Sequence, residues 1–208
     1  NIQGIAMSVP GKIDIEKGVM LTSGALVYLE GLELAEKLSA LCDHLPVSVE
    51  NDGKAAALCE SWVGQAKDCQ SCVVFIFGSG VGGGIVMNHQ VLRGLDLIAG
   101  EFSPVFVDLH QGNYQSFAGE YSTLAVVKKI QNMKEDENID GEQMMQLYRQ
   151  QDEEVVVVLE DWFDAIAKFC YNIDCIMNPE CFCIGGGISQ DPLFVEKIQE
   201  KIDEIFTK

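Results

Sequence analysis

The chain has 208 residues, of which 48% are hydrophobic and 22% charged, a composition typical of a globular protein. It has 14 Lys and Arg residues against 32 Asp and Glu residues, a net charge of −18, so we expect its field to repel nucleic acid. No apolar run reaches the roughly 18 residues that span a membrane, and no secretory signal is visible, so we expect a cytoplasmic protein without a membrane partner.

The first part of the chain predicts strands and one helix. "IQGIAMSVPGKIDIEKGVM" alternates loosely and is broken by Pro10 and Gly11, which predicts a strand, a turn and a second strand. "GLELAEKLSALCDHL" has leucines at helical spacing and predicts a helix that ends before Pro46. Because the chain begins almost inside its first strand, we expect a missing upstream segment.

A polar joint follows in "VSVENDGKAAALCESW". A β-branched strand ends on Glu50, Asn51 and Asp52, and a small-residue helix is predicted from about Gly53 to Val63. Proteins of the α/β class bind ligands at the C-terminal ends of strands, so Asp52 is a candidate general base beside an amide that can orient a hydroxyl. An Asp at this place is also a common helix N-cap, and the residues alone leave the two interpretations about even.

Two glycine-rich turns each follow a predicted strand. "GSGVGGG" (Gly78 to Gly84) lies within a hairpin whose strands end at Phe77 and Met87, and "GGG" begins at Gly185. Glycine lets backbone N–H groups approach a phosphate closely, although a tight turn alone explains either segment. The two turns together with the polar strand end modestly favour a phosphate site.

Helices dominate the remaining sequence. They are predicted from Gly119, behind an Asp140 N-cap, over residues 152–177 and after the "GGG" turn. The whole pattern predicts a mixed α/β protein with two lobes around a cleft.

The eight cysteines are scattered through apolar segments, which is typical of free buried thiols in a reducing compartment. "CQSC" (Cys69 to Cys72) has the spacing of a metal or redox pair. No second Cys or His pair follows at zinc-site spacing, so ordinary thiols are the favoured interpretation and we expect no structural zinc.

Taken in order, "GIAMSVPGKID", "VSVENDGKAAALCE", "GSGVGGGIV", "RGLDLIAGEF" and "CIGGGISQ" resemble the ROK (repressor, open reading frame, sugar kinase) family, from Gly4 to about Ile205. The resemblance implies the actin-like (ribonuclease-H-like) ATPase fold, apparently incomplete at both ends. Residues 1–50 would be the remainder of the N-terminal small lobe. Residues 51–208 would form the larger lobe, with its last helix returning toward the small one.

The resemblance further implies an ATP-dependent sugar kinase and a homodimer. The enzyme would use ATP and Mg²⁺ to phosphorylate the 6-hydroxyl of a hexose or β-glucoside. Its catalytic base would be Asp52, and no residue would be a metal ligand. The sugar ligands would be Gly11, Asn51, Asp52 and Glu101. The phosphate would meet Ser79 and Gly80, and the nucleotide would meet Gly185 and Gly186.

Several departures from the family pattern accompany this resemblance. "GEFSP" places Pro104 where the family often has a histidine, and the cysteine-rich zinc segment is absent, as in a zinc-less branch that includes β-glucoside kinases. A second sugar-binding glutamate aligns with either Ala118 or Glu120. The family's "DxGGT" phosphate motif does not occur, so we expect residues 1–208 alone to be a poor kinase.

Two other functions remain open. One is the non-catalytic sugar-sensing domain of a ROK transcriptional repressor, in which a DNA-binding segment would precede these residues. The other is a degenerate family member that binds sugar weakly or only packs as a dimer.

Overall fold

The computed structural model describes residues 2–24, 26–108 and 114–207, and its first part is a small two-layer unit. Strand β1 (Ile5–Val9) pairs in parallel with β4 (Val47–Asn51), and helix α1 (Leu34–Leu41) connects back toward β4. The predicted second strand is instead a tight antiparallel hairpin of β2 (Ile13–Asp14) and β3 (Val19–Met20), followed by the short helix η1 (Val27–Leu29).

The second part is built on a four-stranded sheet with the order β7-β6-β5-β8. The predicted hairpin is confirmed: β5 (Ser71–Phe77) pairs antiparallel with β6 (Val81–Met87), and the short β7 (Gln90–Val91) extends it. On its other side β5 pairs in parallel with β8 (Cys181–Gly185).

Helices cover both faces of this sheet. Helix α2 (Asp52–Trp62) lies on one face, where Val74 belongs to a small core. The alternate β5 residues Val73, Phe75 and Phe77 enter the main core with the later helices. Both faces of β5 are therefore buried, which explains its continuous apolar sequence. The predicted mixed α/β class is confirmed.

The later helices differ in one place from the sequence prediction. The segment predicted to be one helix from Gly119 is divided at Ser122 into α3 (Phe117–Tyr121) and α4 (Thr123–Lys134). The Ser122 side chain accepts a hydrogen bond from the backbone N–H of Ala125 and so caps α4. The remaining elements are α5 (Gly141–Arg149), α6 (Glu153–Met177), η2 (Gly187–Gln190) and α7 (Pro192–Phe206).

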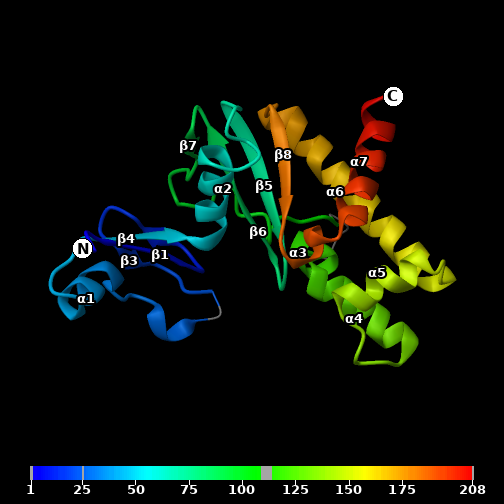
Figure 1. The fold of residues 1–208 in the computed structure, drawn as a ribbon, viewed down its shortest axis with the longest axis horizontal. Helices are drawn as coiled ribbons and strands as arrows, with labels where there is room; N and C mark the ends of the chain where they lie inside the picture. The colour runs from blue at the N-terminus through cyan, green and yellow to red at the C-terminus, as the bar shows by residue number, and fades with distance from the viewer. Residues whose placement is uncertain (1, 25, 109–113, 208) are drawn as a thin grey trace.

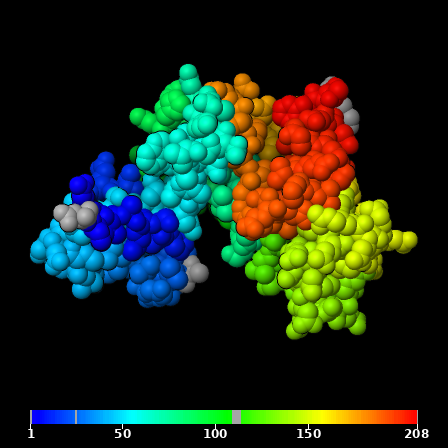
Figure 2. Space-filling model, in the orientation of Figure 1, coloured from blue at the N-terminus to red at the C-terminus, as the bar shows by residue number. Residues whose placement is uncertain are grey.

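Figure 1 shows the two parts joined where β4 runs directly into α2. Helix α7 packs along α6 at the end of the molecule far from β1 and β4. The division into two lobes at residue 50 and the return of the last helix toward the small lobe stay predictions. Figure 2 shows the surface hollowed between the blue first part and the orange and yellow-green helical part. No helix in the described part of the chain has the length and apolar character needed to cross a bilayer.

Candidate functional site

The polar joint between β4 and α2 has a defined hydrogen-bond arrangement. Asn51 is buried, and its Oδ1 accepts a hydrogen bond from the backbone N–H of Lys54 at 2.9 Å, so Asn51 is the N-cap of α2. Asp52 is the first helical residue, and the interpretation of Asp52 as the cap is wrong. Its carboxylate accepts a hydrogen bond from the N–H of Gly53 at 2.8 Å and is exposed at the positive end of the helix. The Asp52 side chain is therefore accessible to a ligand.

Gly11 lies beside this joint because β1 and β4 are parallel neighbours. Val9 is opposite Asn51, and the Asn51 Nδ2 donates a hydrogen bond to the carbonyl oxygen of Gly11 at 3.0 Å. Gly11 has a φ of +99°, and a Cβ there would lie 2.2 Å from the carbonyl oxygen of Thr22. The turn thus requires glycine, and the predicted sugar-binding residues Gly11, Asn51 and Asp52 come together.

Glu101 joins this group through a lysine that the sequence reasoning missed. The Lys54 side chain is only 4% exposed, and its ammonium forms an ion pair with Glu101. The same Nζ donates to the carbonyl oxygen of Leu97 at 3.5 Å. Glu101 is thereby held beside the first turn of α2. The sequence did offer a signal for this lysine, because a charged residue stands next to the alanines that follow the cap.

A second ion pair lies at the same joint. Arg93 pairs with Glu50 and donates to the carbonyl oxygen of Val91 at 3.2 Å. A cavity of about 770 Å³ opens next to it, between the β2–β3 hairpin and the loop over residues 93–97, and neither Asp52 nor Glu101 lines it. The loop that precedes Glu101 thus borders both the ion pairs and this cavity.

The two glycine-rich turns meet because β5 and β8 are parallel neighbours, with Ile76 opposite Gly185. Gly186 has a φ of +100°, and a Cβ there would lie 2.1 Å from the carbonyl oxygen of Phe77. Ser79 is exposed at the tip of the hairpin turn. Both turns leave the same end of the sheet, where α/β proteins bind ligands.

Ser103 connects the Glu101 loop to the hairpin turn, and the sequence reasoning did not single it out. Its Oγ accepts a hydrogen bond from the N–H of Val81 at 3.0 Å and donates to the carbonyl oxygen of the same residue at 3.1 Å. A Cβ on Gly80 would lie 3.0 Å from this Oγ. The predicted phosphate residues and Glu101 are therefore in one connected region.

The second half of "GSGVGGG" has another role than the predicted turn. Gly82, Gly83 and Gly84 belong to β6, and α2 packs directly on Gly83 and Gly84. A Cβ on Gly53 would lie 2.5 Å from the backbone nitrogen of Gly83, and one on Gly84 would lie 2.8 Å from the Cβ of Ala57. These glycines let the helix that carries Asp52 approach the sheet.

A cavity of about 600 Å³ lies behind the "GGG" turn. The buried Thr123 Oγ1 lines it without a hydrogen-bond partner among the described residues, and Arg149 forms an ion pair with Asp191 at its rim. The backbone N–H of Leu124 donates to the carbonyl oxygen of Gly78 at 3.1 Å, which attaches the start of α4 to the hairpin turn. The residues that line this cavity are Thr123, Gly141, Glu142, Met145, Arg149, Gly187, Ile188, Gln190, Asp191 and Pro192.

The described residues contain no group of three or more His, Cys, Asp or Glu side chains arranged to hold a metal ion. The expected lack of structural zinc stays a prediction. Pro104 is exposed, and so is Glu120 on α3; the alignment of Ala118 or Glu120 with a second sugar ligand remains open.

Replacing Glu101 by Gln should lower the free energy of unfolding by about 2 kcal/mol, because the buried Lys54 ammonium loses its ionised partner while Glu101 itself is partly exposed. Urea denaturation measures the change. Glu120→Gln, on an exposed carboxylate, should change stability by less than about 0.5 kcal/mol. Equal stability of the Glu101→Gln and parent proteins would show that the ion pair is not needed.

Comparisons with known proteins place this geometry in context. A family model described as the ROK family matches residues 1–208. A beta-glucoside kinase of Listeria monocytogenes is 29% identical over 210 residues, which cover 98% of this chain and 70% of that protein. A xylose repressor of Caldicellulosiruptor bescii is 27% identical over 221 residues, covering 98% of this chain and 55% of the repressor. Among solved structures, a ROK family protein from Streptococcus pneumoniae in complex with sucrose superimposes with a TM-score of 0.90 at 26% identity, covering 99% of this chain and 70% of that one.

Proposed function

The chain belongs to the ROK family and has its actin-like ATPase fold, and we propose that the protein is an ATP-dependent sugar kinase that phosphorylates the 6-hydroxyl of a hexose or β-glucoside. One observation carries the proposal: an exposed carboxylate, Asp52, stands at the N-terminus of α2 between Gly11 and the Glu101–Lys54 pair, and the next residue, Gly53, packs on Gly83 in the strand that follows the first glycine turn. The beta-glucoside kinase relative and the sucrose-bound neighbour support a sugar as the ligand.

Asp52 would be the general base. It would accept the proton of the 6-hydroxyl as that oxygen attacks phosphorus, a role that contributes about 10²–10⁴ in rate. Among the described residues the Asn51 amide donates to Gly11 with one N–H, and the second N–H can donate to a sugar hydroxyl. Glu101 can accept from another hydroxyl with the oxygen that does not pair with Lys54.

The glycine turns would bind the nucleotide. ATP with Mg²⁺ supplies the phosphoryl group. The backbone N–H groups of Ser79 and Gly80 would donate to its oxygens. Gly185 and Gly186 would allow close approach of the nucleotide, and the cavity behind them has a buried hydroxyl, Thr123 Oγ1, that lacks a partner among the described residues. Mg²⁺ would be bound mainly through the phosphates, since the described residues contain no group of three or more His, Cys, Asp or Glu side chains that could hold it.

Release of ADP in the presence of a panel of sugars tests the reaction, on the purified protein with any residues that flank 1–208 retained. We expect turnover with glucose or a β-glucoside and none with 6-deoxyglucose, because the latter lacks the hydroxyl that accepts the phosphoryl group. If ADP release with 6-deoxyglucose equals the release without any sugar, turnover depends on the 6-hydroxyl, as expected. Turnover with 6-deoxyglucose at the rate of glucose would exclude the 6-hydroxyl as acceptor.

The similarity to a xylose repressor favours a second candidate function, the sugar-sensing domain of a ROK repressor. Such a domain would bind sugar at the Asp52 site without releasing ADP. Calorimetric sugar binding combined with sugar-independent ADP levels would therefore favour the repressor over the kinase. A homodimer, a cytoplasmic location and the absence of nucleic-acid binding by these residues stay predictions, which sedimentation, fractionation and gel-shift measurements can test.

A further inference from the structure

Four of the eight cysteines lie together on the face of the sheet that α2 covers. Cys72 on β5 is directly opposite Cys181 on β8, and Cys183 follows two residues later on the same strand, so the three side chains share one face. Cys69 packs against the same small core from the loop that precedes β5. The motif "CQSC" therefore meets "CFC" only in the folded chain.

Two hydrogen bonds hold the loop of Cys69 against β8. The backbone N–H of Gln70 donates to the Glu180 carboxylate at 3.0 Å, and the backbone N–H of Glu180 donates to the Ser71 Oγ at 3.2 Å. Cys69 and Cys181 are the sequence neighbours of the residues joined by this pair of bonds, and both pack against the same small core. Two cysteines from distant parts of the sequence are thus brought together, one on a loop and the other at the start of a strand.

The surroundings of the four thiols disfavour a metal centre. Burial raises the pKa of Cys72 and Cys183 to about 11 and that of Cys181 to about 12, so these three thiols remain protonated at neutral pH. No group of three ligands in the described ranges is arranged to hold a metal ion. Cys69 is half-buried at the surface, where a small oxidant can reach it.

We propose that Cys69 and Cys181 form a peroxide-sensitive dithiol that closes to an intramolecular disulfide. The Cys69 thiolate attacks one oxygen of hydrogen peroxide, the O–O bond breaks, and the departing oxygen leaves as water, with Cys69 converted to a sulfenic acid. The Cys181 sulfur then attacks the Cys69 sulfur and the S–O bond breaks, while the Cys181 thiol proton passes to the departing hydroxide, which leaves as the second water. Two thiols together lose two electrons, and one peroxide is reduced to two waters.

This disulfide would join two elements of the candidate site. Cys69 follows the helix that begins with Asp52, and Cys181 begins the strand that ends at Gly185. The disulfide would link the loop after α2 to the strand that leads into the second glycine turn. The cross-link would therefore lie between the two halves of the candidate site.

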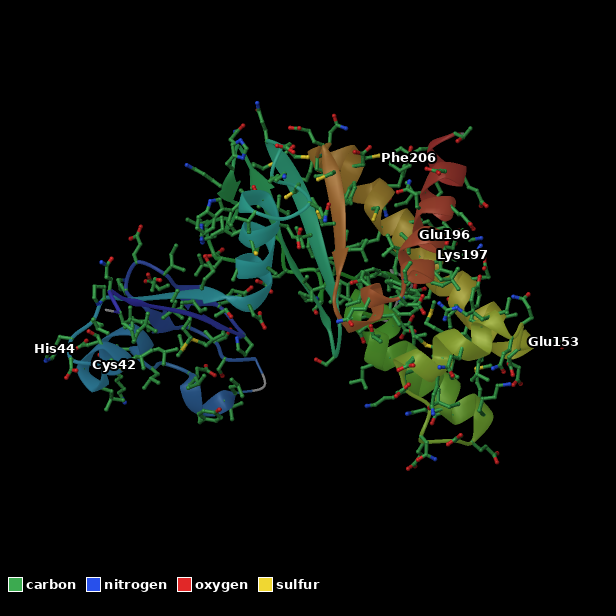
Figure 3. All side chains as sticks on the ribbon, viewed as in Figure 1. Cys42, His44, Glu153, Glu196, Lys197 and Phe206 are labelled. Carbon is green, nitrogen blue, oxygen red and sulfur yellow. The ribbon has the colours of Figure 1, made fainter. Side chains whose placement is uncertain are left out.

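Peptide mapping tests this site on the purified protein. The reduced protein is treated with a small excess of hydrogen peroxide, the remaining thiols are alkylated, and the digest is analysed by mass spectrometry without reduction. We expect one dominant cross-linked peptide pair joining Cys69 to Cys181, lighter by two hydrogens than the two free peptides and lost on treatment with dithiothreitol. Cys69→Ser should abolish it. Cys42→Ser should leave it intact, since Cys42 lies at the outer end of the first part, far from β5 and β8 (Figure 3).

Several results would overturn the proposal. One is a Cys69 oxidised to sulfinic acid with Cys181 still free for alkylation; another is a dominant cross-link between two molecules. Zinc or copper that co-purifies with the protein and is lost in Cys181→Ser would also overturn it. Because Cys181→Ser changes a half-buried strand position, the loop variant Cys69→Ser, compared with the parent by circular dichroism, is the decisive one.

Discussion

Replacing Asp52 by Asn should lower kcat for sugar phosphorylation by about 10²- to 10⁴-fold, because an amide cannot take the proton of the attacking hydroxyl. The KM values for sugar and ATP should change little, since Asn keeps an oxygen that can still accept from a hydroxyl. Folding should survive: Asn51, rather than Asp52, is the N-cap of α2, and only a helix-dipole contribution of about 0.3–1 kcal/mol is lost. Sugar-dependent ADP release measures the effect.

A matched control is Asp68→Asn, an exposed carboxylate in the loop after α2 with no proposed role in the reaction. Its kcat should equal that of the parent protein. If Asp52→Asn retained parental turnover and an unchanged thermal midpoint, Asp52 would not be the base. If neither the parent protein nor Asp52→Asn released ADP although both bound sugar, the sugar-sensing function would be favoured.

Replacing Gly83 by Ala should destabilise the protein by about 3 kcal/mol or more, through overpacking and backbone strain together. The added Cβ would lie 1.9 Å from the carbonyl oxygen of Val74, and Gly83 has a φ of +148°, which a side chain disfavours. Movement of β6 to relieve this contact would also displace α2, because Gly53 packs on Gly83. Urea unfolding monitored by circular dichroism gives the free energy.

Gly82→Ala is the control for this variant. Gly82 is one residue away in the same strand, but its added Cβ would meet nothing closer than the Ile76 Cβ at 3.9 Å. We expect its stability to remain within about 1 kcal/mol of the parent, since glycine and alanine are both tolerated at an open strand position. Similar losses in the two variants would mean that strand propensity, rather than the contact with Val74, sets the requirement for glycine.

Much of the fold was predictable from local pattern. The hairpin of β5 and β6, the helix behind Asp140 and the long helix α6 all follow from apolar periodicity and capping residues. The break at Ser122 was missed, because a single serine within a helical pattern is compatible with continuation as well as with capping. The β2–β3 hairpin was also missed, since two-residue strands carry no measurable alternation.

The candidate site, like the fold, was predictable from the sequence only in part. The local pattern alone made Asn51 and Asp52 candidates, because polar residues at the end of an apolar strand are visible in the sequence. Gly11 and Glu101 became candidate sugar ligands only through the family resemblance. The local pattern could not decide which residue caps α2, nor divide "GSGVGGG" into a turn and a surface on which a helix packs. Those outcomes depend on which backbone lies against which, as in the contact of Gly53 with Gly83.

What the sequence determined by itself was the class of fold, since hydrophobic period, caps and glycine turns are local properties of the chain. The set of candidate residues came from those properties together with the family resemblance. Only the tertiary structure decided the partners: Lys54 with Glu101, Arg93 with Glu50, and the loop of Cys69 with the start of the strand that begins at Cys181. Each pair joins positions far apart in the chain. Their proximity is set by strand register and by the packing of α2 on the sheet, which no local pattern encodes.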